Sequence, residues 1–167
     1  VMVCRRELEF AFGGVGRLDY APEDLHHIVE RLYTPGALGM FDLSFGERAP
    51  VLPGVSVVCL SGHTPGSMAV VVETEAGAVC ICGDVVYDIH GTFVERAGQI
   101  HAFEPQTSGN FVTSRVEEKR AIKLAASLGR FLYPSHDHYG AVMENGQVVG
   151  RIGRTIPGPL LPLDTKY

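Results

Sequence analysis

The sequence lacks the features that mark several large classes of protein. It has no excess of positive charge, since 14 Lys and Arg residues stand against 19 Asp and Glu residues and the net charge is -5. Such a chain has no general field to attract nucleic acid or an anionic membrane. No apolar run approaches the roughly 20 residues of a membrane-spanning helix. We therefore expect a soluble protein with no nucleic-acid or membrane partner, acting on a small molecule.

The sequence also lacks the C-x-x-C spacing that is typical of cysteine-based metal or redox sites. Its four cysteines are Cys4, Cys59, Cys80 and Cys82. Three of them lie in apolar runs, where a reduced thiol behaves as a small hydrophobic side chain. We expect Cys80 and Cys82 to share one buried face of a strand, and we expect a reducing, cytoplasmic location.

An initiating Met and a signal peptide are both absent from the start of the chain. Residues 1–4 form an apolar run that predicts a strand already under way. The 167 residues, 46% of them hydrophobic, are enough for a single domain spanning 1–167 with its own core. We expect further sequence upstream of this domain.

The helix signals are clearest in two places. Pro22 and the acidic residues after it begin a predicted helix whose apolar positions repeat up to Leu32, with His26 and His27 outside the apolar stripe. A second helix is predicted from the capping box at Ser114 up to Gly129. A run at residues 5–12 resembles the start of a helix, but glycines interrupt it.

The strand signals begin at residue 51. Short β-branched runs at 55–60, 68–73 and 78–82 predict strands, the last two as a hairpin. Because these runs are almost continuously apolar, we expect both faces of their sheet to be covered, as in a layered α/β protein. Further predicted elements are a long loop at 84–113, a strand at 131–133, an Asn-Gly hairpin at 142–149 and an irregular Pro-containing tail.

Three segments each place a metal-capable side chain directly after a predicted strand. They read Gly-His-Thr-Pro-Gly-Ser at 62–67, Gly-Asp-Val-Val-Tyr at 83–87 and Pro-Ser-His-Asp-His at 134–138. Because ligands bind at strand ends in layered α/β proteins, we expect His63, Asp84 and His136 to converge. Imidazole and carboxylate together suit zinc, iron or manganese. Taken singly, each segment is equally compatible with a capped turn or an exposed loop.

The order and spacing of these motifs resemble the second half of a metallo-β-lactamase-superfamily hydrolase, over residues 51–137. The resemblance implies the α/β four-layer αβ/βα sandwich of that superfamily, with its N-terminal part missing from this chain. It implies that His63 binds the first of two divalent metals, typically zinc. Asp84 would bridge both metals and His136 would bind the second.

Tyr87, three residues after Asp84, resembles the tyrosine of the N-acyl-homoserine lactonase branch. There the phenol assists attack by a metal-bridging hydroxide on a lactone or ester carbonyl, so Tyr87 and Asp84 are the expected catalytic residues. Ordinary packing of a tyrosine is the alternative for Tyr87. A glutathione thioester, a phosphodiester or a β-lactam are alternative substrates of the same fold.

The chain also departs from the superfamily pattern. The His-x-His-x-Asp-His motif, which supplies four more ligands, is absent. Ser67 stands where many relatives have His, and Ser61 where Pro is common. We therefore expect the isolated chain to hold metal weakly and turn over little. The alternative is a non-catalytic half-domain that completes its sandwich with another chain, and the sequence leaves a homodimer open.

Three other histidines follow Asp84 in the sequence. They are His90, His101 and His138. His138 is expected to be a loop residue near the site, whereas contact of His90 or His101 with substrate stays open.

Overall fold

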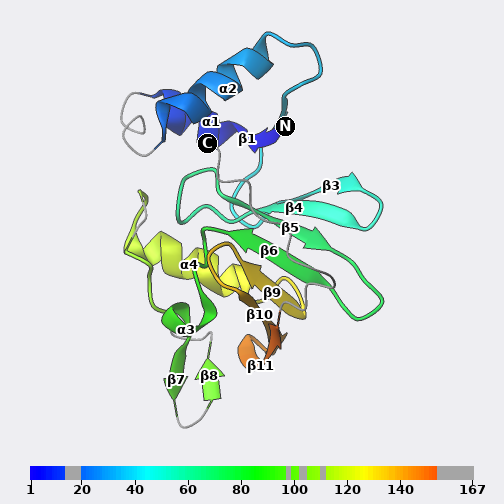
Figure 1. The fold of residues 1–167 in the computed structure, drawn as a ribbon, viewed down its shortest axis with the longest axis vertical. Helices are drawn as coiled ribbons and strands as arrows, with labels where there is room; N and C mark the ends of the chain where they lie inside the picture. Colours follow the sequence, from blue (N-terminus) through cyan, green and yellow to red (C-terminus); the bar gives the residue numbers. More distant parts are fainter. Residues whose placement is uncertain (14–19, 97–98, 102–104, 110–111, 154–167) are drawn as a thin grey trace, which may run out of the picture.

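A mixed sheet of nine strands dominates the described part of the chain, in the order β3-β4-β5-β6-β9-β10-β11-β8-β7 (Figure 1). The computed structural model describes residues 1–13, 20–96, 99–101, 105–109 and 112–153. The strands of this sheet are β3 (Arg48–Leu52), β4 (Val55–Cys59), β5 (Met68–Val72), β6 (Val79–Gly83), β7 (Val94–Arg96), β8 (Gln99–His101), β9 (Phe131–Pro134), β10 (Tyr139–Glu144) and β11 (Gln147–Gly153). The strands predicted from residue 55 to residue 149 are therefore confirmed.

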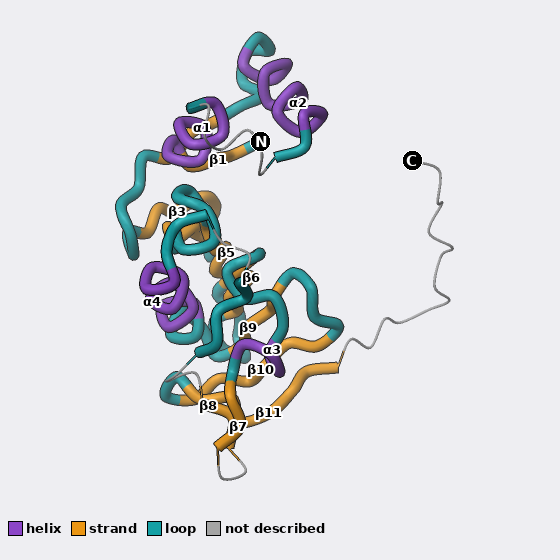
Figure 2. Tube along the Cα trace, turned by 90° about the vertical axis from the view of Figure 1, so that its left-hand side faces the viewer, coloured by secondary structure: helices purple, strands orange, loops and turns teal. Residues whose placement is uncertain are grey.

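The helices and strands within residues 1–13 and 20–41 build a separate layer at one end of the molecule, opposite the β7–β8 end (Figures 1 and 2). In it β1 (Met2–Cys4) pairs in parallel with β2 (Gly39–Phe41), beside α1 (Arg5–Phe12) and α2 (Pro22–Leu32). The predicted strand at 1–4 and the helix from Pro22 are confirmed. We call β1, α1, α2 and β2 the N-terminal unit.

Helix α4 (Arg115–Ala125) covers one face of the large sheet (Figure 1). The predicted capping box is present, because the Ser114 hydroxyl accepts a hydrogen bond from the Glu117 amide and donates one to the Glu117 carboxylate. The helix ends at Ala125, before the predicted stop at Gly129. Gly129 instead lies so close to β6 that a Cβ there would be 2.6 Å from the Ala78 carbonyl oxygen.

The main core lies between α4 and this face of the sheet. Its members include Leu60, Ala69, Val71, Cys80, Cys82, Ala121, Ile122, Ala125 and Leu132. Cys80 and Cys82 are both fully buried in it, so the prediction that they share one buried face is confirmed. All four cysteines are buried and free of disulfides.

The opposite face of the sheet corrects a prediction. We expected both faces to be covered, but burial alternates along β5, and the Ile81 side chain on β6 is 47% exposed. Among the described residues, a small cluster of Cys4, Leu43, Val57 and Cys59 covers the end nearest the N-terminal unit. These strands therefore have more apolar side chains than the described residues bury.

Short elements replace part of the long loop predicted at 84–113. They are α3 (Ile89–Thr92), β7 and β8. β8 joins the sheet by pairing with β11, where His101 lies opposite Gln147. The pairing partner is remote in sequence, which is why no local pattern marks this strand. The Pro-containing tail at 154–167 lies outside the described residues.

The Asn-Gly hairpin is confirmed at β10–β11. Asn145 and Gly146 both have positive φ, 51° and 73°, as a tight two-residue hairpin turn requires. None of the helices among the described residues has the length and hydrophobicity that crossing a lipid bilayer requires.

Strand direction determines which loops meet. β5 is antiparallel to both β4 and β6, so β4 and β6 run the same way, and β9 runs parallel to β6. The carboxyl ends of β4, β6 and β9 therefore lie at one edge of the sheet. This edge carries the three segments that the sequence singled out.

Candidate metal centre

The structure brings together the three predicted metal ligands. The Nε2 atom of His63 lies 3.8 Å from Oδ2 of Asp84, and the Nε2 atom of His136 lies 3.4 Å from Oδ1. Each imidazole thus faces its own oxygen of one carboxylate. The His63 side chain is 17% exposed, against 45% for Asp84 and 55% for His136, so the group opens toward solvent on the His136 side.

The turn that carries His63 begins with an unusual backbone. Ser61 and Gly62 both have positive φ, 52° and 92°. Proline, with φ fixed near -65°, does not fit this position. Gly62 packs against α4, where a Cβ would lie 2.5 Å from the Cβ of Ala121. The turn therefore lies directly on the helix.

Ser67 closes the same turn from its other end. Its hydroxyl accepts a hydrogen bond from the Thr64 amide at 3.0 Å and shares a 2.7 Å hydrogen bond with the Thr64 hydroxyl. Its carbonyl accepts from the amides of Leu60 and Ser61. Where many relatives have a histidine, this chain uses a small hydroxyl residue to fix the turn.

Asp84 follows β6 directly and has a hydrogen-bond partner that sequence reasoning missed. The Ser135 hydroxyl donates to Oδ1 of Asp84 at 2.6 Å, the same oxygen that faces His136. Ser135 precedes His136 at the end of β9, so its position in the Ser-His-Asp-His string was the available signal. This hydrogen bond fixes the orientation of the carboxylate.

Tyr87 lies between the two histidines. Its ring stacks on that of His136, with centroids 4.5 Å apart and planes at 9°, and meets His63 edge-on at 5.8 Å. The Tyr87 carbonyl also accepts a hydrogen bond from the His136 amide. The structure thus places this tyrosine at the same group of side chains as the three predicted ligands.

The remaining residues of the Ser-His-Asp-His string are structural or peripheral. Asp137 accepts hydrogen bonds from the amides of Ile89 and Tyr139, which fastens the loop to α3. His138 is exposed, as expected of a loop residue, and His90 is exposed on α3. The His101 side chain lies outside the described part of the structure. His26 and His27 are exposed on α2 beside Glu30, as predicted.

A cavity of about 490 Å³ opens between the N-terminal unit and the candidate metal centre. One wall carries His63, Thr64, Gly83 and Asp84, and the other carries residues of β1 and α1. A second residue missed by sequence reasoning, Glu7 of α1, lies on that wall. Its contacts with the turn reach across more than 50 residues, so no local signal could have marked it.

The donor atoms are of a kind that binds metals, but the described residues supply too few of them. Imidazole nitrogen and carboxylate oxygen are ordinary zinc ligands. Among the described residues, however, no three His, Cys, Asp or Glu side chains form a group able to hold one ion. The donors fall into two pairs that share Asp84. Each histidine thus lies within 4 Å of Asp84, and the described residues add no third donor to either pair.

Comparisons with known proteins point to the fold. No protein-family model matches the sequence, and neither does any curated protein. The structure of AbOPH, a hydrolase of the β-lactamase superfamily, is similar to this chain, with a TM-score of 0.54 and 14% identity. The aligned region covers 92% of this chain and 54% of AbOPH. This likeness shows that the chain has the fold of that hydrolase, and the predicted fold class is confirmed.

Lactonase structures also match, over a smaller part of the chain. One is the AiiA lactonase of B. thuringiensis with N-decanoyl-L-homoserine bound, with 26% identity and a TM-score of 0.38. The aligned region covers 52% of this chain and 30% of the lactonase. An N-acyl homoserine lactone hydrolase with its product bound at the catalytic metal centre matches with the same values. The match to this chain spans under a third of these lactonases and about half of the AbOPH hydrolase.

Proposed function

We propose that this chain is the metal-binding part of a hydrolase that cleaves a lactone or ester. The observation that carries the proposal is the pairing of His63 and His136 with the two oxygens of Asp84. A carboxylate shared in this way suits a pair of divalent metals about 3.5–4 Å apart, the spacing of two-metal hydrolytic sites. The fold shared with a β-lactamase-superfamily hydrolase supports the same conclusion.

His63 and Asp84 would hold one metal, and Asp84 and His136 the other. Zinc is the proposed metal, and iron or manganese suits the same donors. When bound, two such ions polarise a carbonyl group and lower the pKa of water that they bind. Ser135 would hold the Asp84 carboxylate in its bridging orientation through its 2.6 Å hydrogen bond.

Tyr87 is the proposed catalytic residue beside the metals. Its ring contacts both histidines, so a substrate that reaches the metals must also pass close to this side chain. A phenol hydroxyl can donate a hydrogen bond to a carbonyl oxygen or a leaving oxygen as charge develops there. The stacked His136 ring holds the phenol in place for that role.

The substrate class rests on the resemblance of the Asp84–Tyr87 segment to lactonases. We propose an N-acyl-homoserine-lactone-like substrate and a role in quorum quenching. A glutathione thioester, a phosphodiester or a β-lactam are the competing substrates. A panel of one compound from each class, assayed on the zinc-loaded chain, separates them, and faster turnover of any competing class overturns the lactonase assignment.

The primary test is metal binding by the chain itself. Equilibrium dialysis against zinc is expected to show weak binding that depends on Asp84, with slow hydrolysis of N-hexanoyl-homoserine lactone. Binding is expected to be weak because the described residues supply only two donor pairs. The absence of zinc binding at millimolar zinc overturns the metal site. Tight binding of two ions with fast turnover shows instead that the ligand set is complete.

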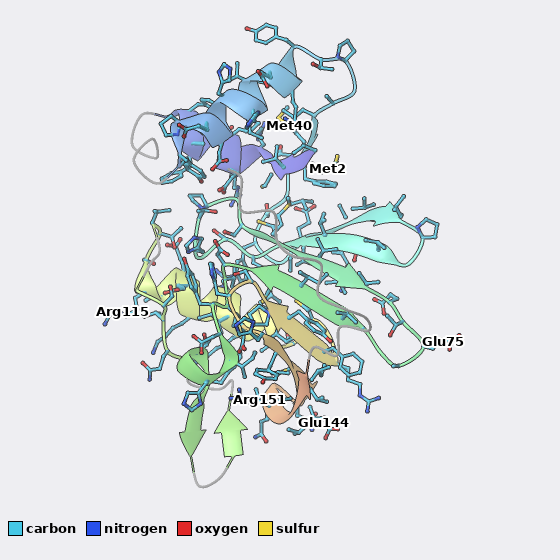
Figure 3. The ribbon with its side chains drawn as sticks, viewed as in Figure 1. Met2, Met40, Glu75, Arg115, Glu144 and Arg151 are labelled. Atoms are coloured by element: carbon cyan, nitrogen blue, oxygen red, sulfur yellow. The ribbon has the colours of Figure 1, made fainter. Side chains whose placement is uncertain are left out.

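A second candidate function is a non-catalytic half-domain that completes its sandwich with another chain. It is favoured by large apolar side chains exposed in the N-terminal unit (Figure 3 labels Met2 and Met40). These residues are Met2, Phe12, Leu32 and Met40. A two-stranded sheet is also marginal without further strands. Size-exclusion chromatography with light scattering tests this candidate: a homodimer or larger assembly supports it, and a compact monomer contradicts it.

The proposed location is the cytoplasm. Its support is the state of the four cysteines, all of them buried and none in a disulfide. Reduced thiols of this kind persist in reducing compartments. Fractionation of cells that express the protein tests the location.

A further inference from the structure

Glu7 on α1 contacts the turn that carries His63. Its Oε2 atom accepts hydrogen bonds from the Thr64 hydroxyl at 2.7 Å and from the Gly66 amide at 2.9 Å. Its Oε1 atom accepts one from the Tyr20 hydroxyl. One carboxylate therefore ties the N-terminal unit to the two residues that flank Pro65.

The backbone of Glu7 is as close to the turn as its side chain. A Cβ built on Gly66 would lie 2.4 Å from the Glu7 amide nitrogen and 2.5 Å from its Cβ. On the other side, Gly62 is pressed against Ala121 of α4. The turn is thus held between α1 and α4, with His63 between its two contact points.

Few contacts among the described residues orient the His63 ring. Its Nδ1 atom is buried without a hydrogen-bond partner among the described residues. Histidines that bind metals usually donate from this second nitrogen to a carboxylate or carbonyl, which sets the direction of the ring. Among the described residues, this direction is set by the Asp84 and Tyr87 side chains and by the backbone of the turn. The His63 carbonyl accepts from the Val112 amide at 2.9 Å, and Glu7 holds the next residue, Thr64.

We propose that Glu7 is a positioning residue for the metal site, and that it keeps the His63 ring directed at Asp84 by fixing the turn. The inference rests on the proposed function, in which His63 is a metal ligand. Glu7 contacts the turn and Tyr20, so its effect on the metal would pass through His63.

The competing explanation is that Glu7 only stabilises α1, since an acidic residue in the first turn of a helix has that effect. Glu9 provides a matched control, because it lies on the same helix and is exposed. It forms an ion pair with Arg5, four residues earlier. Glu9→Ala therefore removes an acidic side chain of the same type without touching the turn.

The experiment compares Glu7→Ala, Glu7→Gln and Glu9→Ala in the full chain. Zinc affinity is measured by competition with a chromophoric chelator, and the His63 ring nitrogens and the Gly66 amide are followed by NMR without metal. We expect Glu7→Ala to weaken zinc binding about 10- to 100-fold, the usual effect of losing a residue that orients a ligand. Glu7→Gln should stay within about threefold of the wild type, because its amide oxygen accepts the same two hydrogen bonds. Glu9→Ala should leave affinity unchanged.

The NMR measurements without metal test the role of Glu7 separately from the proposed function. Glu7→Ala should shift the His63 ring nitrogens and speed hydrogen exchange at the Gly66 amide, and Glu9→Ala should do neither. If the wild type binds no zinc, the proposed function fails, and these signals alone decide the role of Glu7. Equal behaviour of Glu7→Ala and Glu9→Ala overturns the proposal, as does loss of affinity in Glu7→Gln. If Glu7→Ala does not fold, Thr64→Val removes one of the same hydrogen bonds and must reproduce the shift.

Discussion

The Tyr87 ring lies flat against the His136 ring, with 4.5 Å between centroids and 9° between planes. This contact joins the loop after β6 to the loop after β9. Because stacking depends on the ring and not on the hydroxyl, the two properties of Tyr87 can be separated by substitution. A phenylalanine retains the stack and removes only the donor.

Tyr87→Phe is therefore expected to slow hydrolysis while leaving metal binding intact. Losing a hydrogen-bond donor to a developing negative charge lowers the rate by about 100-fold or more in well-studied enzymes. Single-turnover hydrolysis of a p-nitrophenyl ester by the zinc-loaded chain measures the rate, and equilibrium dialysis measures zinc affinity. An unchanged rate shows that the hydroxyl takes no part.

Asp84→Asn should abolish the metal site. The amide retains the size of the carboxylate but loses its charge, and both histidines lose their common partner. We expect zinc affinity to fall by more than about 100-fold, beyond the effect of losing a residue that only orients a ligand. Ser135→Ala is the control, with a smaller loss, because only the 2.6 Å hydrogen bond to Asp84 disappears.

Gly66→Ala tests the close approach of α1 to the turn. The added methyl group would lie within 2.7 Å of three Glu7 atoms, so the chain must shift. Overpacking of this kind typically lowers the free energy of unfolding by about 1–3 kcal/mol. Urea unfolding measures it. Gly150→Ala is the control, since its methyl group would meet Val142 at an ordinary 3.6 Å.

The buried thiols should resist modification. Burial raises the pKa of Cys59 to about 11 and that of Cys80 to about 12, and it raises the pKa of Cys82 further. The reactive thiolate is therefore scarce near pH 8. We expect a disulfide reagent to modify these three cysteines slowly in the native protein and rapidly in urea. Fast modification of the native protein contradicts their burial.

The same thiols should weaken the fold in alkali. Above the ordinary thiol pKa of 9.0, the unfolded chain loses protons that folded Cys80 retains up to about pH 12. The folded state then binds more protons, so the free energy of unfolding falls as pH rises above 9. Cys80→Ala should make this decline shallower in urea titrations between pH 8 and 11. A decline of equal slope in both proteins shows that other groups cause it.

The sequence predicted the elements that local chemistry determines. The helix from Pro22 and the capping box at Ser114 depend on neighbouring residues, and so does the Asn145-Gly146 turn. The convergence of His63, Asp84 and His136 was also predicted, because each follows a strand. Strands of one direction bring such loops to one edge whatever the details of packing.

Other features depend on contacts between distant residues and had no local signal. β8 exists through its pairing with β11, and the Glu7 carboxylate reaches Thr64 across 57 residues. For Ile81 the sequence predicted burial, but the side chain is exposed. An apolar run indicates that a strand favours burial, but none of the described residues covers that part of the sheet.

Because β4, β6 and β9 run in one direction, the proposed metal ligands all lie at one edge of the sheet, away from the opposite edge. The turn between β5 and β6 lies there, and Figure 3 places the exposed Glu75 at its far end. Five residues of extended β6 separate this turn from Asp84, about 16 Å. That turn is therefore a suitable attachment point for a fluorophore or a surface linker, which would report on the protein while leaving the proposed metal ligands untouched.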